Sequence, residues 1–342
     1  MSVRAVAIVL VAAVLAIAVT APAQVQTVSR PASLSRSIVI DATPIASFHP
    51  SQPDQRRFGA LEFRGGLVLS SRAREFGGLS GMVMAPDGAS FLALSDRANW
   101  FSGKIVYDGT RPVAITGSRV SPILGPDGLP LAARRWWDTE SLTGDGTTLY
   151  VGLEHVDRIV RFDYGKNGVL ARGKPLDLPN IKGLRRNQGL EGLALVPKGQ
   201  APLGGTLLAF TERTLDDSGN LRAFLIGGPM PGNFTVRRTD NFDISDAAML
   251  PSGDVLILER KFSLLEGLGI RLRRLPITAI KPNALVDGPV LFDVDFGYEV
   301  DNMEALGVHT ASDGAVVLTM LSDDNFYFFQ RTLLLQFTLL DE

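Results

Sequence analysis

Acidic side chains recur at matching places along this sequence. Five segments share one pattern: a small or acidic residue opens an apolar run, a turn follows, and a second apolar run ends in an acid. The residues at the opening and closing places are, in chain order, Ser80 and Asp96, Glu140 and Glu154, Glu191 and Glu212, Asp246 and Glu259, and Glu304 and Asp323. Nine of these ten are carboxylates, whereas only 36 of the 342 residues are acidic, so chance placement does not explain the pattern.

Carboxylates that crowd into one place repel each other, and they must be protonated, paired with a base or bridged by a cation. Ca²⁺ accepts 6–8 oxygen ligands with flexible geometry, which suits a ring of acids. The chain has no cysteine, and its three histidines are scattered, so a soft-metal site is disfavoured. The predicted Ca²⁺ ligands are Asp96, Glu140, Glu154, Glu191, Glu212, Asp246, Glu259, Glu304 and Asp323. The alternative for any of them is a bond that ties neighbouring repeats together.

Basic residues directly follow several of the closing acids. We expect Arg97, Arg213, Arg260 and Lys261 to bind substrate phosphate oxygens, with a salt bridge to the neighbouring acid as the alternative. A basic cluster at 182–187 precedes the third repeat and either attracts a polyanion or is a solvated loop.

The catalytic residue stays unassigned. Ser80 lies in a Gly-Leu-Ser-Gly-Met stretch that lacks the second glycine of a nucleophile elbow, and it is better explained as a departure from the acidic pattern.

The acids are positioned by hairpins. Each repeat is a strand, a turn and a returning strand, with turns such as Pro86-Asp87-Gly88 and Ser312-Asp313-Gly314. The first strand starts where the second one ends, so the opening and closing residues are neighbours. A strand repeat of about 50–60 residues is typical of a β-propeller, and the acids would then meet at one mouth of its channel. The regular period argues against the alternative, a large sandwich.

Further strand candidates follow each hairpin, so the fold class is all-β, a propeller of four-stranded blades. The repeat count predicts five blades, and a sixth is possible if residues 38–48 supply strands. The last repeat runs out of chain after three strands. Residues 60–70 can supply the missing strand, so the two ends of the domain would close one blade and leave no sheet edge.

The first 23 residues differ from the rest. Arg4 precedes an uncharged apolar stretch, and Ala21-Pro22-Ala23 offers small residues at a cleavage site. We therefore expect a signal peptide over 1–23, a flexible leader over 24–36, a propeller domain over 37–342, and a periplasmic or secreted protein. An uncleaved anchor helix is the alternative.

A net charge of −2 and a pI near 6.0 do not favour a nucleic-acid or anionic membrane partner.

Several phrases together resemble the bacterial phytase-like family, described as having esterase-like activity of phytase. The matching phrases are Arg64-Gly65-Gly66-Leu67 with Gly77-Gly78-Leu79-Ser80-Gly81, Leu94-Ser95-Asp96-Arg97, Arg135-Trp136-Trp137-Asp138-Thr139-Glu140, Asn187-Gln188-Gly189-Leu190-Glu191, Asp301-Asn302-Met303-Glu304-Ala305-Leu306, Leu321-Ser322-Asp323-Asp324-Asn325-Phe326 and Gln330-Arg331-Thr332-Leu333-Leu334-Leu335. The match covers about residues 60–340. It implies a phosphoester or ester hydrolase, similar to calcium-dependent propeller phytases.

Three functions stay open from the sequence. The first is a Ca²⁺-dependent phosphoesterase that acts on a small-molecule ester as a monomer. The second is a lactonase or carboxylesterase on the same frame, with His155 or His309 as the base. The third is a binding protein without catalytic activity, in which the acids serve stability.

Overall fold

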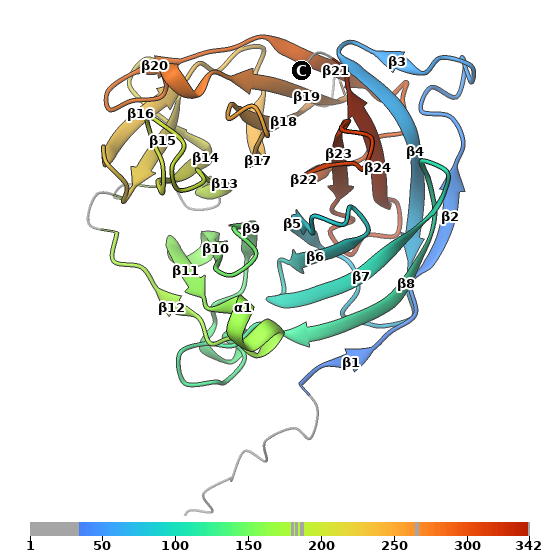
Figure 1. Ribbon diagram of the computed structural model, residues 1–342, viewed down its shortest axis with the longest axis horizontal. Helices are drawn as coiled ribbons and strands as arrows, with labels where there is room; N and C mark the ends of the chain where they lie inside the picture. The colour runs from blue at the N-terminus through green and yellow to red at the C-terminus, as the bar shows by residue number, and fades with distance from the viewer. Residues whose placement is uncertain (1–33, 179–180, 182–183, 185–187, 264–266, 341–342) are drawn as a thin grey trace, which may run out of the picture. The chain divides into compact units, whose positions relative to one another are not determined.

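The computed structural model describes residues 34–178, 181, 184, 188–263 and 267–340. Leu34–Glu342 form one compact unit. Its strands build five mainly antiparallel sheets arranged in a ring, a five-bladed β-propeller (Figure 1). The all-β class and the count of five blades are confirmed. The predicted signal peptide and nearly all of the predicted leader lie outside the described residues.

Each blade runs from an inner strand at the channel to an outer strand. Blade 1 contains β5 (Leu79–Met84), β6 (Ser90–Ser95), β7 (Asn99–Asp108), β8 (Arg111–Pro122) and β1 (Arg36–Ser37). Blade 2 contains β9 (Thr139–Gly144), β10 (Leu149–Leu153), β11 (Arg158–Phe162) and β12 (Lys174–Pro175). Blade 3 contains β13 (Leu190–Leu195), β14 (Leu207–Leu215), β15 (Leu221–Ile226), β16 (Gly232–Val236) and β20 (Leu285–Val286). Blade 4 contains β17 (Asp243–Met249), β18 (Val255–Ser263), β19 (Gly267–Leu275) and β21 (Val290–Asp295).

Blade 5 joins the two ends of the domain, as predicted. It contains β22 (Met303–Thr310), β23 (Val316–Ser322), β24 (Thr332–Leu339), β4 (Leu61–Ser70) and β2 (Asp41–Ile45), with β3 (Arg57–Phe58) beside β4. β24 pairs antiparallel with β4, with Leu334 opposite Leu67. Part of the segment considered for a sixth blade forms β2, the outermost strand of blade 5.

Helical structure is confined to single turns in the described residues. They are α1 (Tyr164–Asn167) and four 3₁₀ turns, Leu131–Arg134, Glu154–Val156, Gly168–Leu170 and Ile277–Ala279. No described helix is long and apolar enough to cross a membrane.

The core lies between the blades. Leu258 of β18 and Leu335 of β24 belong to one buried cluster that joins blades 4 and 5, and Leu94 of β6 and Val151 of β10 belong to another that joins blades 1 and 2. The predicted hairpin turns hold the inner strands in register. Gly88, for example, adopts a φ of 66°, a conformation that glycine takes without steric cost.

Candidate active site at the acidic mouth

A β-bulge interrupts the first hairpin of every blade at the same place. The register skips one residue between Leu79 and Gly81, and it skips the equivalent residue in the other four inner strands. The skipped residues are Ser80, Glu140, Glu191, Ser245 and Glu304. A bulged residue leaves the ladder and its side chain is re-aimed. The bulge therefore turns three glutamates out of their sheets at one end of the channel.

The second strand of each hairpin brings another side chain to the same end. The residue just past the bulged pair is Asp96, Glu154, Glu212, Arg260 and Asp323 in blades 1 to 5. In four blades its N–H donates to a carbonyl that precedes the inner strand of the same blade, for example from Asp96 to Gly78 at 2.9 Å. These ten positions form what we call the acidic mouth.

Blade 4 departs from the prediction by one residue on both strands. Asp246 and Glu259 were expected at the mouth, but the register places Ser245 and Arg260 there. A shift of one residue along a strand moves a side chain to the other face of the sheet. The mouth therefore holds seven of the nine predicted acids and one cation.

The two displaced acids hold the propeller together. Asp246 is 1% exposed and accepts the N–H of Leu306 on the next blade at 2.7 Å. Glu259 is fully buried and forms two hydrogen bonds with Arg273, at 2.6 and 2.7 Å. Burial raises the pKa of both carboxyls. The alternative considered from the sequence, a bond between neighbouring repeats, describes Asp246.

The serines at two bulges also connect blades. The Ser245 hydroxyl donates to the Met303 carbonyl of blade 5 at 2.9 Å, and the Ser80 hydroxyl donates to the Thr139 carbonyl of blade 2. Both serines are fully buried. The buried Ser80 hydroxyl therefore links blades 1 and 2, and it is not exposed to a substrate as a nucleophile would be.

Arg260 is the cation at the centre of the acids. Its guanidinium lies 2.9 Å from Glu304, 3.3 Å from Glu212 and 3.9 Å from Glu191, and it donates to the Asn302 side chain at 2.6 Å. Blade 4 thus supplies one positive charge to the carboxylates of blades 3 and 5. One guanidinium does not neutralise seven carboxylates.

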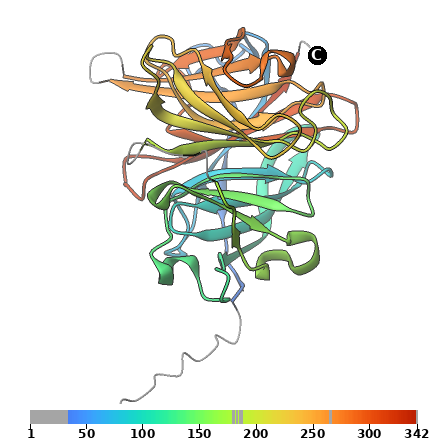
Figure 2. The ribbon, with the colours of Figure 1, turned by 90° about the vertical axis from the view of Figure 1, so that its left-hand side faces the viewer.

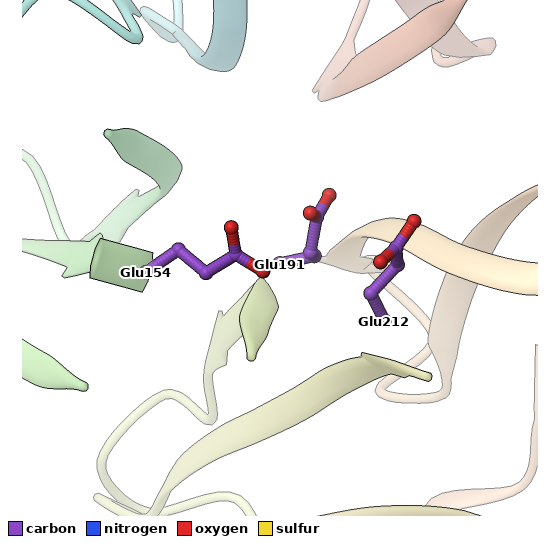
Figure 3. A group of neighbouring side chains, drawn as sticks. All are labelled: Glu154, Glu191 and Glu212. Atoms are coloured by element: carbon purple, nitrogen blue, oxygen red, sulfur yellow. The ribbon is translucent and has the colours of Figure 1, made fainter. Parts of the chain in front are cut away.

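Three glutamates at the mouth are close enough to share one ion. Carboxylate oxygens of Glu154, Glu191 and Glu212 all lie within 4.8 Å of one another. Figure 3 shows the three side chains next to each other, with their carboxylates at neighbouring positions. Glu191 is 6% exposed, and Glu154 is fixed by accepting the Gly189 N–H at 2.7 Å.

Burial and crowding raise the pKa values of carboxyls at the mouth. Burial, with the nearby Glu191 and Glu304 charges, holds the pKa of Glu140 well above its usual range. Burial raises the pKa of Glu154 to about 7. Burial likewise raises the pKa of Asp96 to about 7, and burial and the Glu304 charge raise the pKa of Asp323 to about 9. Because a nearby cation favours the ionised form of a carboxyl, a cation bound at the mouth would oppose these shifts.

The donor set fits Ca²⁺. The mouth offers carboxylate oxygens and no thiol or imidazole among its ten positions, and a hard cation prefers oxygen. One carboxylate oxygen of Asp96, Oδ1, is buried without a hydrogen-bond partner, so the mouth also has unused acceptor capacity. The trio of Glu154, Glu191 and Glu212 is the part of the mouth where a metal could bind.

The predicted phosphate-binding cations have different surroundings. Arg260 lies at the mouth. Arg97 stacks on the Phe326 ring at 3.2 Å, Arg213 donates to Asp243 at 2.6 Å, and Lys261 lies 5.0 Å from the Phe242 ring centre. Most of the basic cluster at 182–187 lies outside the described residues.

The two histidines considered as bases are far apart in the blades. His155 follows Glu154 at the mouth, where its ring stacks on Trp137 at 5.3 Å. His309 lies near the opposite end of β22, beside Gly88 of blade 1. Only His155 is on the side of the acids, so the alternative with His309 as the base loses its geometric support.

Comparison with family models gives a match to the phytase-like family, described as esterase-like activity of phytase, over residues 74–326. The match covers more than half of the chain. The chain belongs to this family. The matched span contains all ten positions of the acidic mouth.

Solved structures match this chain at low sequence identity and low TM-score. A structure described as an oxidoreductase (glucose dehydrogenase) from Thermus thermophilus is 17% identical, covers 87% of this chain and all of that one, and has a TM-score of 0.37. A structure described as a 6-phosphogluconolactonase from Bacteroides fragilis is 11% identical over 85% of this chain and 93% of that one, with a TM-score of 0.39. Raptor from Chaetomium thermophilum is 12% identical over 89% of this chain and 24% of that one, with a TM-score of 0.35. Curated proteins give no match.

Proposed function

We propose that this chain is an exported Ca²⁺-dependent hydrolase of small phosphate or carboxylic esters that works at the acidic mouth. The observation that carries the proposal is the position of Arg260 among seven carboxylates, three of which have oxygens within 4.8 Å of one another. Membership of the phytase-like family supports an ester substrate. Phosphate esters are the preferred class, and lactones and carboxylic esters are the second.

In this proposal Glu154, Glu191 and Glu212 hold the metal, and Glu140 extends the ligand set from the neighbouring bulge. When bound, Ca²⁺ would neutralise carboxylate charge, attract a phosphoryl oxygen and make water more acidic. Arg260 would keep Glu304 and Glu212 oriented and present N–H groups to a substrate oxygen. Asp96, with its unpartnered oxygen, is the residue we assign to accept a proton from water.

The binding test is thermal unfolding of the mature protein in EDTA and in Ca²⁺. We expect Ca²⁺ to raise the unfolding midpoint, because a ligand that binds only the folded state stabilises it. Glu191→Gln should abolish most of this rise. Glu62→Gln is the matched control, since Glu62 is exposed on β4 away from the inner strands, and it should leave the rise intact.

The catalytic test is a substrate screen of the same preparations. Phytate, 4-nitrophenyl phosphate, 4-nitrophenyl acetate and a γ-lactone sample the ester classes. Hydrolysis that depends on Ca²⁺ and on Glu191 supports the proposal. Binding of Ca²⁺ with no hydrolysis of any ester would instead favour a binding protein, and no response to Ca²⁺ or EDTA would remove the metal from the proposal.

Export is also part of the proposal and rests on the sequence of residues 1–23. Its test is N-terminal sequencing of the protein recovered from the periplasm or medium of cells that express the full chain. A mature protein that starts at Gln24 is the expected result. Retention of Met1 in the membrane fraction would favour the anchor.

A further inference from the structure

Three consecutive aromatic residues are exposed in the loop between β23 and β24. Tyr327, Phe328 and Phe329 are 58%, 100% and 68% exposed. The rings of Tyr327 and Phe329 stack at 5.4 Å, and Phe328 lies edge-on to Phe329 at 5.5 Å. We call these three residues the aromatic tip. Contiguous exposed apolar surface of this kind marks an interaction site on a folded protein.

The base of this loop is anchored on both sides. The Asp324 side chain accepts the Gly78 N–H of blade 1 at 3.0 Å and the Thr332 hydroxyl at 2.9 Å. Asp323 accepts the Asn325 N–H at 2.6 Å, and the Arg331 N–H donates to Asp301 at 3.0 Å. The protein therefore holds the base in place and presents the aromatic tip to the outside.

A second apolar projection lies on the same side of the ring. Phe262, near the end of β18, is 69% exposed, and Phe296, just after β21, is 61% exposed. β18 ends and β19 begins at the mouth, as β23 ends and β24 begins there. In Figure 2 the ends of the orange strands β18 and β19 and the red loop between β23 and β24 lie toward the same face of the propeller. Two separate apolar projections, from the neighbouring blades 4 and 5, thus lie at the end of the ring that carries the acidic mouth.

The size of the aromatic tip argues against a protein partner. A fully exposed aromatic side chain offers roughly 150–250 Å², so the three rings at their measured exposures offer about 450 Å². A stable protein interface buries about 800 Å² on each partner. A lipid layer, in contrast, is a plane that two separated projections can enter together.

The chemistry of the tip points to the same partner. Residues 325–330 carry no charge, and tyrosine and phenylalanine are suited to the boundary between headgroups and acyl chains. The carboxylates of the mouth lie at the same end of the ring as the two projections and would repel an anionic surface. We propose that the aromatic tip, with Phe262, docks this protein on an uncharged or zwitterionic lipid layer with its acidic mouth facing the layer. The proposal does not depend on the hydrolase or on Ca²⁺.

The test is co-sedimentation of the mature protein with phosphatidylcholine vesicles in EDTA. We expect measurable partition at millimolar lipid that is insensitive to salt between 0.05 and 0.5 M, and weaker partition on vesicles rich in phosphatidylglycerol. The triple variant Tyr327→Ser, Phe328→Ser, Phe329→Ser should lose at least tenfold in partition coefficient. Leu170→Ser, which changes an apolar residue that is 53% exposed and lies in a different loop, should bind as the wild type does.

Two further measurements keep the result interpretable. Circular dichroism must show that the triple variant unfolds at the wild-type temperature, and Phe262→Ser provides a second variant outside the loop that should also weaken binding. No partition of the wild type, or equal partition of wild type and triple variant, would overturn the proposal. A tip-dependent dimer by size exclusion, without vesicle binding, would overturn it in favour of a second copy of this chain.

Discussion

Replacing Glu154 with glutamine isolates the electrostatic cost of one carboxylate at the acidic mouth. Glutamine keeps the shape of the side chain and can still accept the Gly189 N–H, which lies 2.7 Å from Glu154. The substitution therefore removes the ionisable group and retains the contact.

The magnitude follows from the pKa. Burial raises the pKa of Glu154 from 4.5 to about 7 in the folded chain. The folded state thus binds a proton on Glu154 more tightly than the unfolded state does. The stability that this tighter proton binding contributes is fully present below pH 4.5 and is lost as the pH rises through 7. Each pKa unit corresponds to about 1.4 kcal/mol, so the wild type should lose about 2.5 kcal/mol between pH 5 and pH 8 through this group.

The assay is urea unfolding in EDTA at pH 5 and pH 8. Between pH 5 and pH 8, the free energy of unfolding of Glu154→Gln should rise by about 2.5 kcal/mol relative to that of the wild type. The free energy of unfolding of Glu62→Gln should change with pH as that of the wild type does. The remaining acids, Asp96 among them, continue to make both proteins less stable at the higher pH. A free-energy difference between Glu154→Gln and the wild type that is the same at both pH values would refute the reasoning.

Two other substitutions separate the roles of the arginines in blade 4. Arg273→Met leaves the buried Glu259 carboxylate without its partner, so we expect the free energy of unfolding in urea to fall by about 3–5 kcal/mol. The rise in unfolding midpoint caused by Ca²⁺ should change little. If adding Glu259→Met to the same chain restores stability, the loss came from the broken ion pair and not from packing. Arg260→Gln removes the cation that contacts Glu191, Glu212 and Glu304, so the midpoint in EDTA should fall and Ca²⁺ should bind several-fold more tightly by calorimetry. Weaker Ca²⁺ binding in Arg260→Gln would show that the arginine supports the ion instead of competing with it.

The fold followed from the sequence because its determinants are local and repeated. Turn residues such as Gly88 and Gly314 mark the hairpins, and the alternation of apolar residues marks the strands. Closure of blade 5 was predictable for a different reason. The last repeat lacked one strand, and residues 60–70 were the unassigned strand that could complete it.

The register in blade 4 was the part that the sequence did not reveal. Asp246 and Glu259 are acids next to the expected positions, and side-chain type alone could not show that the bulge falls on Ser245. A better signal was available in Ser80, since serine occupies the equivalent bulge of blade 1 and makes the same kind of bond to the next blade. Bulge positions depend on inter-strand pairing, which local sequence specifies only weakly.

The exposed aromatic tip was not predicted either. Its residues lie between two phrases that matched the phytase-like family, and an aromatic run beside strands is ordinarily assigned to a core. Exposure is decided by the anchoring bonds of Asp324 and Arg331 at the base of the loop, and these connect residues that are far apart in the chain.

The pairing of β4 with β24 has a consequence for biosynthesis. During synthesis β4 emerges from the ribosome long before β24. The edge of β4 that pairs with β24 therefore stays unpaired while blades 1 to 4 are synthesised. Glu304 and Asp323 belong to the blade that this pairing completes, and the mouth therefore gains its full set of acids only at the end of folding. A chain that stops before residue 332 would leave β4 as an open edge, a template for aggregation and a target for proteases.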